Sequence, residues 1–92
     1  MKKVIISPSV LGADYNNFAA ELNKIKEAGM KWVHFDVMDG EFVKNISFGN
    51  LFLKTVCLNL DLIKDVHIMV NNPLDKVEFF AEIGADYLTF HY

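Results

Sequence analysis

The chain has no arginine, only one cysteine and no long apolar run. Because all nine basic residues are lysines, no guanidinium fork can grip a phosphate, which would have to be held by backbone N–H groups or lysine. Cys57 has no partner for an intrachain disulfide, which favours a reducing compartment. No segment approaches the roughly 18 apolar residues of a membrane span, and the apolar run before Ser7 and Pro8 is too short for a signal peptide. We therefore expect a soluble cytoplasmic protein without a membrane partner.

Charge and composition narrow the class of protein further. The formal net charge is -3 and the lysines are scattered, so no basic patch is present and no nucleic-acid partner is expected. Hydrophobic residues make up 52% and aromatic residues 13% of the 92 residues, which is typical of a globular chain. At this length the chain forms one domain at most.

Four short apolar runs alternate with three helical patterns along the chain. The predicted strands span 3–7, 31–37, 65–70 and 86–91. The first helix is predicted to follow Asp14 as N-cap and to stop at Gly29. The second spans 50–58, and the third starts with Asn72 as cap and Pro73 at the first helical position and stops at Gly84. This β-α-β-α-β-α-β order predicts an α/β fold with a parallel sheet and right-handed crossovers.

Helical spacing predicts which side chains face the sheet. These are Tyr15, Phe18, Ala19, Leu22 and Ile25 in the first helix, Leu51, Phe52, Thr55 and Val56 in the second, and Val77, Phe80 and Ala81 in the third.

Two segments of the chain are similar to each other in sequence. Residues 27–36, "EAGMKWVHFD", match residues 82–91, "EIGADYLTFH", in form: a helix end, a glycine, an aromatic residue, and a strand that ends on a titratable group. Two successive strand–helix units separate the copies, so the second and fourth strands would play equivalent parts. In a (β/α)8 barrel, alternate strands fill the same layer of side chains.

Strand periodicity separates an apolar face from a polar one. Residues two apart share a face, so Val33, Phe35 and Val37 oppose Trp32, His34, Asp36 and Met38. By the same rule Val66, Ile68 and Val70 oppose Asp65, His67 and Met69, and Leu88 and Phe90 oppose Tyr87, Thr89 and His91. Parallel strands are usually apolar on both faces, and burying an unpartnered carboxylate costs several kcal/mol. The polar side chains on these strands are therefore expected to have a structural or functional role.

Two imidazoles and a carboxylate near the carboxyl ends of neighbouring strands suggest a divalent metal. His34 and Asp36 would come from one strand and His67 from the next, a set that zinc, iron, manganese and cobalt all accept. Met38 and Met69 would lie just above as polarisable walls. The alternative is that such histidines are hydrogen-bonded core or rim residues, which is the interpretation we favour for His91 alone.

Two acidic positions receive plainer interpretations. Asp65 shares the polar face but lies near the start of its strand, so we interpret it as a rim residue or as a group that supports a ligand. We interpret Asp39 and Gly40 as residues of a tight turn.

Four motifs resemble, in order and spacing, the N-terminal half of the ribulose-phosphate 3-epimerase family. They are "ISPSVLGAD", "HFDVMDGEFVKN" with the following "ISFG", "DVHIMV" followed by "NNP", and "GADYLTFH", and the match runs from about Ile6 to the last residue. The family commonly has proline where Lys44 stands and often histidine where Glu41 stands. Neither departure falls on a proposed ligand.

The resemblance implies a (β/α)8 barrel that interconverts ribulose 5-phosphate and xylulose 5-phosphate. It implies that His34, Asp36 and His67 bind a divalent metal, that Asp36 is also a catalytic acid/base, and that Ser9 and His67 contact the ketose phosphate. Met38 and Met69 would line the substrate pocket.

The resemblance also implies that a second acidic residue and the phosphate-binding loops come from the C-terminal half of the barrel. Residues 1–92 would then be the N-terminal half of one barrel domain, with the C-terminal half absent.

Two further possibilities stay open at this stage. The chain could be complete, as a non-catalytic half-barrel that is stable only by self-association and binds metal. A related 3-epimerase of a hexulose phosphate such as allulose 6-phosphate is an alternative within the enzyme class. We favour the N-terminal part of a full epimerase, since a four-stranded half-barrel leaves open edges and an exposed apolar surface. We also expect a homo-oligomer.

Overall fold

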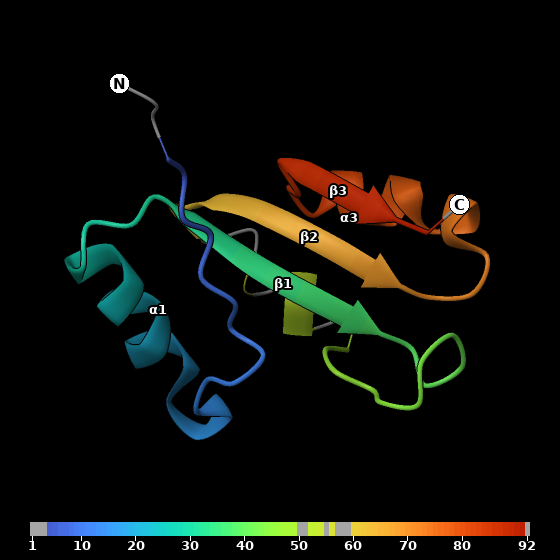
Figure 1. Cartoon of the computed structure of the whole chain (residues 1–92), viewed down its shortest axis with the longest axis horizontal. Helices are drawn as coiled ribbons and strands as arrows, with labels where there is room; N and C mark the ends of the chain where they lie inside the picture. Colours follow the sequence, from blue (N-terminus) through green and yellow to red (C-terminus); the bar gives the residue numbers. More distant parts are fainter. Residues whose placement is uncertain (1–3, 50–51, 55, 57–59, 92) are drawn as a thin grey trace.

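The computed structural model describes residues 4–49, 52–54, 56 and 60–91, and it shows helices packed on one parallel sheet (Figure 1). The strands lie in the order β1-β2-β3. Their bounds are Trp32–Met38 for β1, Ile63–Met69 for β2 and Tyr87–Phe90 for β3. Both neighbouring pairs are parallel. The predicted α/β class and the last three predicted strands are therefore confirmed.

Two helices each begin after a short 3-10 turn, a few residues later than the sequence signals predicted. Helix α1 (Phe18–Glu27) follows a short 3-10 turn, η1 (Tyr15–Asn17), and Asp14 caps that turn by accepting a hydrogen bond from the Asn16 N–H at 3.0 Å. Helix α3 (Val77–Glu82) follows a second 3-10 turn, η2 (Pro73–Asp75). As predicted, Asn72 occupies the cap position and Pro73 follows it, but they start the 3-10 turn, and the Asn72 side chain, at a φ of 51°, makes no cap hydrogen bond.

Both helices stop at a glycine in the left-handed conformation. Gly29 has a φ of +83° and Gly84 a φ of +96°. After α1 the Gly29 N–H donates to the Lys26 carbonyl and the Met30 N–H to the Ile25 carbonyl. This is the Schellman pattern, which satisfies the last carbonyls of a helix, and the same pattern closes α3. The predicted stops are confirmed.

Residues 52–54 and 56 are helical between β1 and β2. The remaining positions of the predicted helix 50–58, with Leu51 and Thr55 among its expected inward residues, lie outside the described residues. Leu53 is buried in the core, whereas Phe52, which we expected to face inward, is exposed.

The core lies on one face of the sheet, where the helices pack. On this face β1 contributes Val33, Phe35 and Val37, all buried as the alternation predicted, and β2 contributes Val66 and Ile68. The side chains packed against them are Phe18 and Leu22 of α1, Phe48, Leu53, Phe80 of α3 and Ile83. In Figure 1 α3 lies behind β3 and the short helical segment of residues 52–54 lies behind β1, so the opposite face of these strands is turned toward the viewer.

Two alanines expected in the buried helical stripes are exposed instead. Ala19 and Ala81 lie toward solvent, and Ile83, beyond the end of α3, is buried in place of Ala81. The expectation of buried alanines was wrong because the tilt at which a helix docks on the sheet selects which of two adjacent stripes faces inward. Helical periodicity alone does not contain that angle.

The first predicted strand, 3–7, is also wrong over the residues described. Val4, Ile5 and Ile6 are exposed and not in a strand. Pairing begins only further on, where the His34 N–H donates to the Pro8 carbonyl at 2.8 Å and the Val10 N–H donates to the His34 carbonyl at 3.1 Å. An apolar run becomes a buried strand only when a partner strand and a covering layer are present, and the described residues provide neither for 4–6.

A buried lysine joins the beginnings of β2 and β3. The Lys64 ammonium donates to the Leu62 carbonyl at 3.1 Å and lies 3.6 Å from an Asp86 carboxylate oxygen, which also accepts from the Lys64 N–H at 2.8 Å. These partners satisfy a charge that would otherwise be costly to bury.

No described helix has both the length and the apolarity that a bilayer crossing needs.

The packing predicts different costs for one substitution at two sites. Ile68→Val should lower the free energy of unfolding by about 0.5–1.5 kcal/mol, because Ile68 is fully buried. Ile46→Val should change it by no more than about 0.5 kcal/mol, since Ile46 is 76% exposed. Urea denaturation of both variants measures the difference, and equal costs would contradict this placement of the core.

Candidate metal centre

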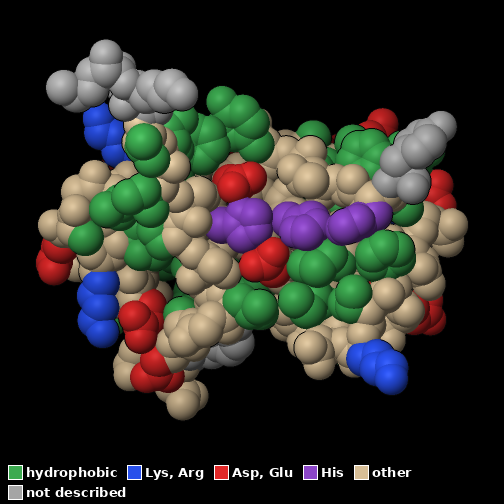
Figure 2. Space-filling model, in the orientation of Figure 1, with side chains coloured by type: hydrophobic (Ala, Val, Ile, Leu, Met, Phe, Trp, Pro, Cys, Tyr) green, Lys and Arg blue, Asp and Glu red, His purple; other side chains and the backbone are tan. Residues whose placement is uncertain are grey.

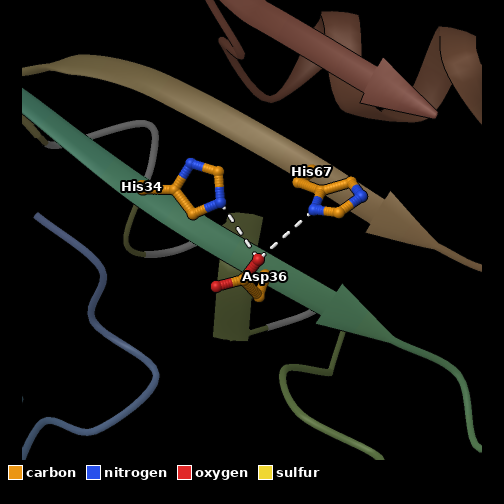
Figure 3. Close-up of side chains that lie close together, drawn as sticks. All are labelled: His34, Asp36 and His67. Atoms are coloured by element: carbon orange, nitrogen blue, oxygen red, sulfur yellow. Dashed lines mark hydrogen bonds and ion pairs between the residues drawn. The ribbon is translucent and has the colours of Figure 1, made fainter. Parts of the chain in front are cut away.

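Three side chains meet on the face of the sheet opposite the core (Figure 3). His34 and Asp36 are two residues apart in β1 and therefore point the same way. His67 of β2 is the register partner of Asp36. The His34 Nε2 atom lies 3.0 Å and the His67 Nδ1 atom 3.4 Å from the same oxygen, Asp36 Oδ1. The convergence predicted for these three residues is confirmed as geometry.

The three side chains fit a divalent cation in chemistry and in spacing. One donor atom from each, two imidazole nitrogens and a carboxylate oxygen, lie within 4.8 Å of one another. Ligand atoms bound to zinc at about 2.0–2.2 Å lie roughly 3 to 3.5 Å apart, close to the spacings of the Asp36 oxygen from the two histidines. All three side chains are half-buried, so they are held in place yet accessible. The donor set is equally suited to iron, manganese or cobalt.

The ligand candidates have partners on their far sides. The His34 Nδ1 atom lies 2.8 Å from Asp65 Oδ2, and the Ser7 hydroxyl donates to that same oxygen at 3.2 Å. The Ser9 hydroxyl donates to Asp36 Oδ2 at 3.1 Å. Metal-binding histidines commonly donate their second N–H to a carboxylate, which holds the ring in one orientation. Asp65 has this geometry toward His34, in agreement with the expectation of a supporting group.

The environment of His34 changes its proton affinity. Burial by itself lowers the pKa of His34, but hydrogen bonds to Asp65 and to Asp36, reinforced by the charges of both carboxylates, outweigh burial and raise the pKa above its ordinary value of 6.5. When His34 is protonated, both of its ring nitrogens carry an N–H, one directed at Asp65 and the other at Asp36. A cation bound at Nε2 would have to displace the proton there.

The remaining predicted site residues lie around the cluster. Ser9 reaches Asp36 from the segment before α1 and is also bridged to His34 of β1. Met38 and Met69 are register partners, one step further along the same face than Asp36 and His67. Both methionines are half-buried at the carboxyl ends of their strands. The structure thus brings together Ser9, His34, Asp36, Met38, His67 and Met69.

His91, the residue after β3, extends the cluster beyond β2. Its Nε2 atom lies 2.8 Å from His67 Nε2, and the two rings are 5.0 Å apart. Figure 2 shows the histidine side chains as one continuous row across the sheet, with acidic side chains against it. We expected a hydrogen-bonded rim histidine, but not this partner. Strand periodicity could have predicted this contact, because His91 shares a face with Thr89, and Thr89 is the register partner of His67.

Two loops that follow strands are tied together beside the site. The Asp39 carboxylate accepts from the Glu41 and Phe42 N–H groups at 2.9 Å, as the turn interpretation predicted, and also from the Asn71 N–H at 2.8 Å. These bonds, led by that from Asn71, hold the pKa of Asp39 below its usual range. The hydrogen bond to Asn71 joins residues far apart in the chain, and no local sequence pattern predicted it.

Ser47 closes the same loop back onto β1. Its hydroxyl donates to the Asp36 carbonyl at 2.6 Å and accepts from the Met38 N–H at 2.9 Å. The backbone on both sides of Val37 is therefore clamped at the point where the strand presents Asp36 and Met38. The sequence interpretation missed this role for Ser47.

The raised pKa of His34 predicts how the metal-free chain responds to pH. Because the folded pKa lies above the unfolded value of about 6.5, protonated His34 stabilises the fold fully below pH 6.5. That contribution is lost as pH rises through the folded pKa. Imidazole proton signals in an NMR titration give the folded pKa directly, and denaturation at a series of pH values gives the loss of stability.

Asp65→Asn is the matched control for this titration. It keeps the shape of the side chain but removes the charge, so the midpoint of the His34 titration should move to lower pH. An unchanged midpoint would contradict the role of the Asp65 carboxylate.

The fold and the cluster together define an α/β protein with a candidate divalent-metal centre near the carboxyl ends of parallel strands. Residues 5–92 match the model of the family described as "Ribulose-phosphate 3 epimerase family", and the chain belongs to that family. The predicted (β/α)8 barrel is the fold of this family, and the three parallel strands form an open part of such a sheet.

Curated relatives carry the same family name. The ribulose-phosphate 3-epimerase of Treponema pallidum is 44% identical over 86 residues, which cover 94% of this chain and 39% of that protein. The enzyme of the same name from Synechocystis is 40% identical over 98% of this chain and 39% of its own length. A rice protein named as the cytoplasmic isoform is 41% identical over 94% of this chain and 38% of its own length. The chain thus spans about two-fifths of the length of these relatives.

Proposed function

We propose that the protein to which this chain belongs is a ribulose-phosphate 3-epimerase that uses a divalent metal held by His34, Asp36 and His67. One observation carries the proposal: two imidazole nitrogens on neighbouring strands converge on the same Asp36 oxygen. Family membership supplies the substrate class, a ketose phosphate, through the name of the matched family. The reaction interconverts ribulose 5-phosphate and xylulose 5-phosphate.

The two oxygens of Asp36 are suited to different tasks. Oδ1 faces both histidine nitrogens, whereas Oδ2 lies 3.1 Å from the Ser9 hydroxyl. In the proposed reaction Oδ2 receives the proton that leaves the carbon next to the ketone. The Ser9 hydroxyl holds this oxygen in position and is itself placed to contact the substrate.

A divalent cation at this centre would stabilise the negative charge that develops on the substrate oxygens when the proton leaves. The residues of this chain hold the centre and the base on one side of the sugar. Met38 and Met69 offer an apolar wall toward the strand ends, which limits the access of water to the reacting carbon.

Inversion at carbon needs an acid on the opposite side, which returns a proton to the other face of the planar intermediate. The base and metal ligands above are all presented on one face of β1 and β2. We therefore propose that the chain forms the N-terminal half of one barrel domain. The opposing acid and the phosphate-binding loops would come from the remaining strands of a longer chain.

A cytoplasmic location is part of the same proposal. One relative carries "cytoplasmic isoform" in its name, and the lone cysteine fits a reducing compartment.

Asp36→Asn in the full-length protein tests the proposed role of this residue. The amide keeps the shape but can neither take the proton nor neutralise the cation, so turnover should fall by about 10²–10⁴-fold and metal affinity should fall with it. A coupled assay of xylulose 5-phosphate formation gives the rate, and a chelator competition gives the affinity.

Asp61→Asn is the matched control, because Asp61 is an exposed carboxylate just before β2, at the end of the strand away from the cluster. It should leave both quantities unchanged. A near-normal rate in Asp36→Asn would remove Asp36 from the proposed mechanism.

The proposed half-barrel makes a prediction about the isolated 92-residue chain. Large apolar side chains are exposed at Val4, Ile5, Ile6 and Phe90, where further strands of a barrel would cover them. The isolated chain should therefore bind an apolar dye and self-associate. Dye fluorescence and sedimentation velocity measure both. A well-folded monomer without dye binding would contradict the half-barrel proposal.

A further inference from the structure

His67 uses its two ring nitrogens in opposite directions. Nδ1 lies 3.4 Å from Asp36 Oδ1 and so faces the candidate metal centre. Nε2 lies 2.8 Å from His91 Nε2, within hydrogen-bond distance. The donor and acceptor roles in this contact depend on which nitrogen of each ring carries the proton.

Ligation decides that question for His67. A neutral imidazole carries one N–H, so a cation bound at Nδ1 leaves the proton on Nε2, which then has to donate. The only way for His91 Nε2 to complete the contact is to accept, with the His91 proton on Nδ1. From this geometry, and resting on the metal centre of the proposed function, we infer that His91 is a positioning residue that holds His67 in the orientation and tautomer that ligate metal.

The acceptor is itself held in place from a different part of the chain. The ring of Phe42 lies 5.0 Å from the ring of His91 at an angle of 37°. Phe42 belongs to the loop after β1, and its N–H donates to Asp39 Oδ1. Asp39 also binds the Asn71 N–H, in the segment that follows β2. The orientation of His91 therefore depends on two loops that are tied to each other.

The two histidine ligands thus have supports of different charge. His34 has the Asp65 carboxylate at 2.8 Å, whereas His67 has the His91 imidazole at the same distance. Asp36 and Asp65 already bring two negative charges to the cluster, enough to balance a divalent cation. A neutral acceptor orients His67 without adding a third carboxylate to the site.

Two substitutions of His91 separate its acceptor from its bulk. His91→Phe keeps a ring to pack on Phe42 but offers no acceptor. His91→Gln offers an amide oxygen in place of the imidazole nitrogen. His91 is exposed, so neither change should shift the denaturation midpoint.

The first readout is the Zn²⁺ affinity of the full-length protein, measured by chelator competition. We expect His91→Phe to weaken Zn²⁺ binding by about 10- to 100-fold, the usual effect of removing an outer-shell partner. His91→Gln should restore most of the loss. Equal affinity in the wild type and His91→Phe would overturn the inference, and so would an equal loss in both variants.

The second readout is the ring proton of His67 in the Zn²⁺-loaded chain. A hydrogen-bonded Nε2–H should give a downfield NMR signal protected from solvent exchange in the wild type and in His91→Gln, and no such signal in His91→Phe. A protected signal in all three proteins would also overturn the inference.

The two proposals fail in different ways. A wild-type chain that binds no Zn²⁺ removes the metal centre and the role of His91 with it. Zn²⁺ binding that does not depend on His91 leaves the metal centre standing and removes only the positioning role.

Discussion

The parallel pairing of β1 with β2 is the constraint on which the other features depend. Its register sets Asp36 opposite His67 and Met38 opposite Met69. Side chains alternate along a strand, so a slip of one residue would turn the polar row into the core and Val66 and Ile68 into solvent. The same register therefore protects the hydrophobic core and assembles the candidate metal centre. The stability of the fold and the geometry of the site therefore depend on one set of backbone hydrogen bonds.

The polar face is stable because its charged groups partner one another across the strands. A chain of contacts runs from Ser7 through Asp65 to His34, and from Asp36 through His67 to His91. Half-buried carboxylates without partners would cost a large part of the stability margin of a small domain. Protonated His34 can donate to both carboxylates, which lowers that cost. Folding and protonation are therefore linked through the same few atoms that would hold a metal.

The predictions from the sequence succeeded where one local rule decides the outcome. Alternation along β1 placed His34 and Asp36 on one face and Phe35 on the other, as observed. Glycines stopped both helices, because only a residue without a Cβ adopts a left-handed backbone without strain.

The predictions failed where packing against a distant segment decides. Residues 4–6 of the strand expected at 3–7 are exposed and outside any strand, and Ala19 and Ala81 face solvent although helical periodicity placed them inward.

The sequence by itself determined the order of α1, β1, β2, α3 and β3, the apolar and polar faces of β1 and β2, and the three donors suited to a divalent metal. These follow from periodicities of two and 3.6 residues and from the chemistry of single side chains. Only the tertiary structure decided that Asp65 supports His34, that His91 meets His67, and that Asp39 ties two loops together through Asn71. Each of those contacts joins residues more than twenty positions apart, and their distances depend on strand register and loop path, which no local pattern encodes.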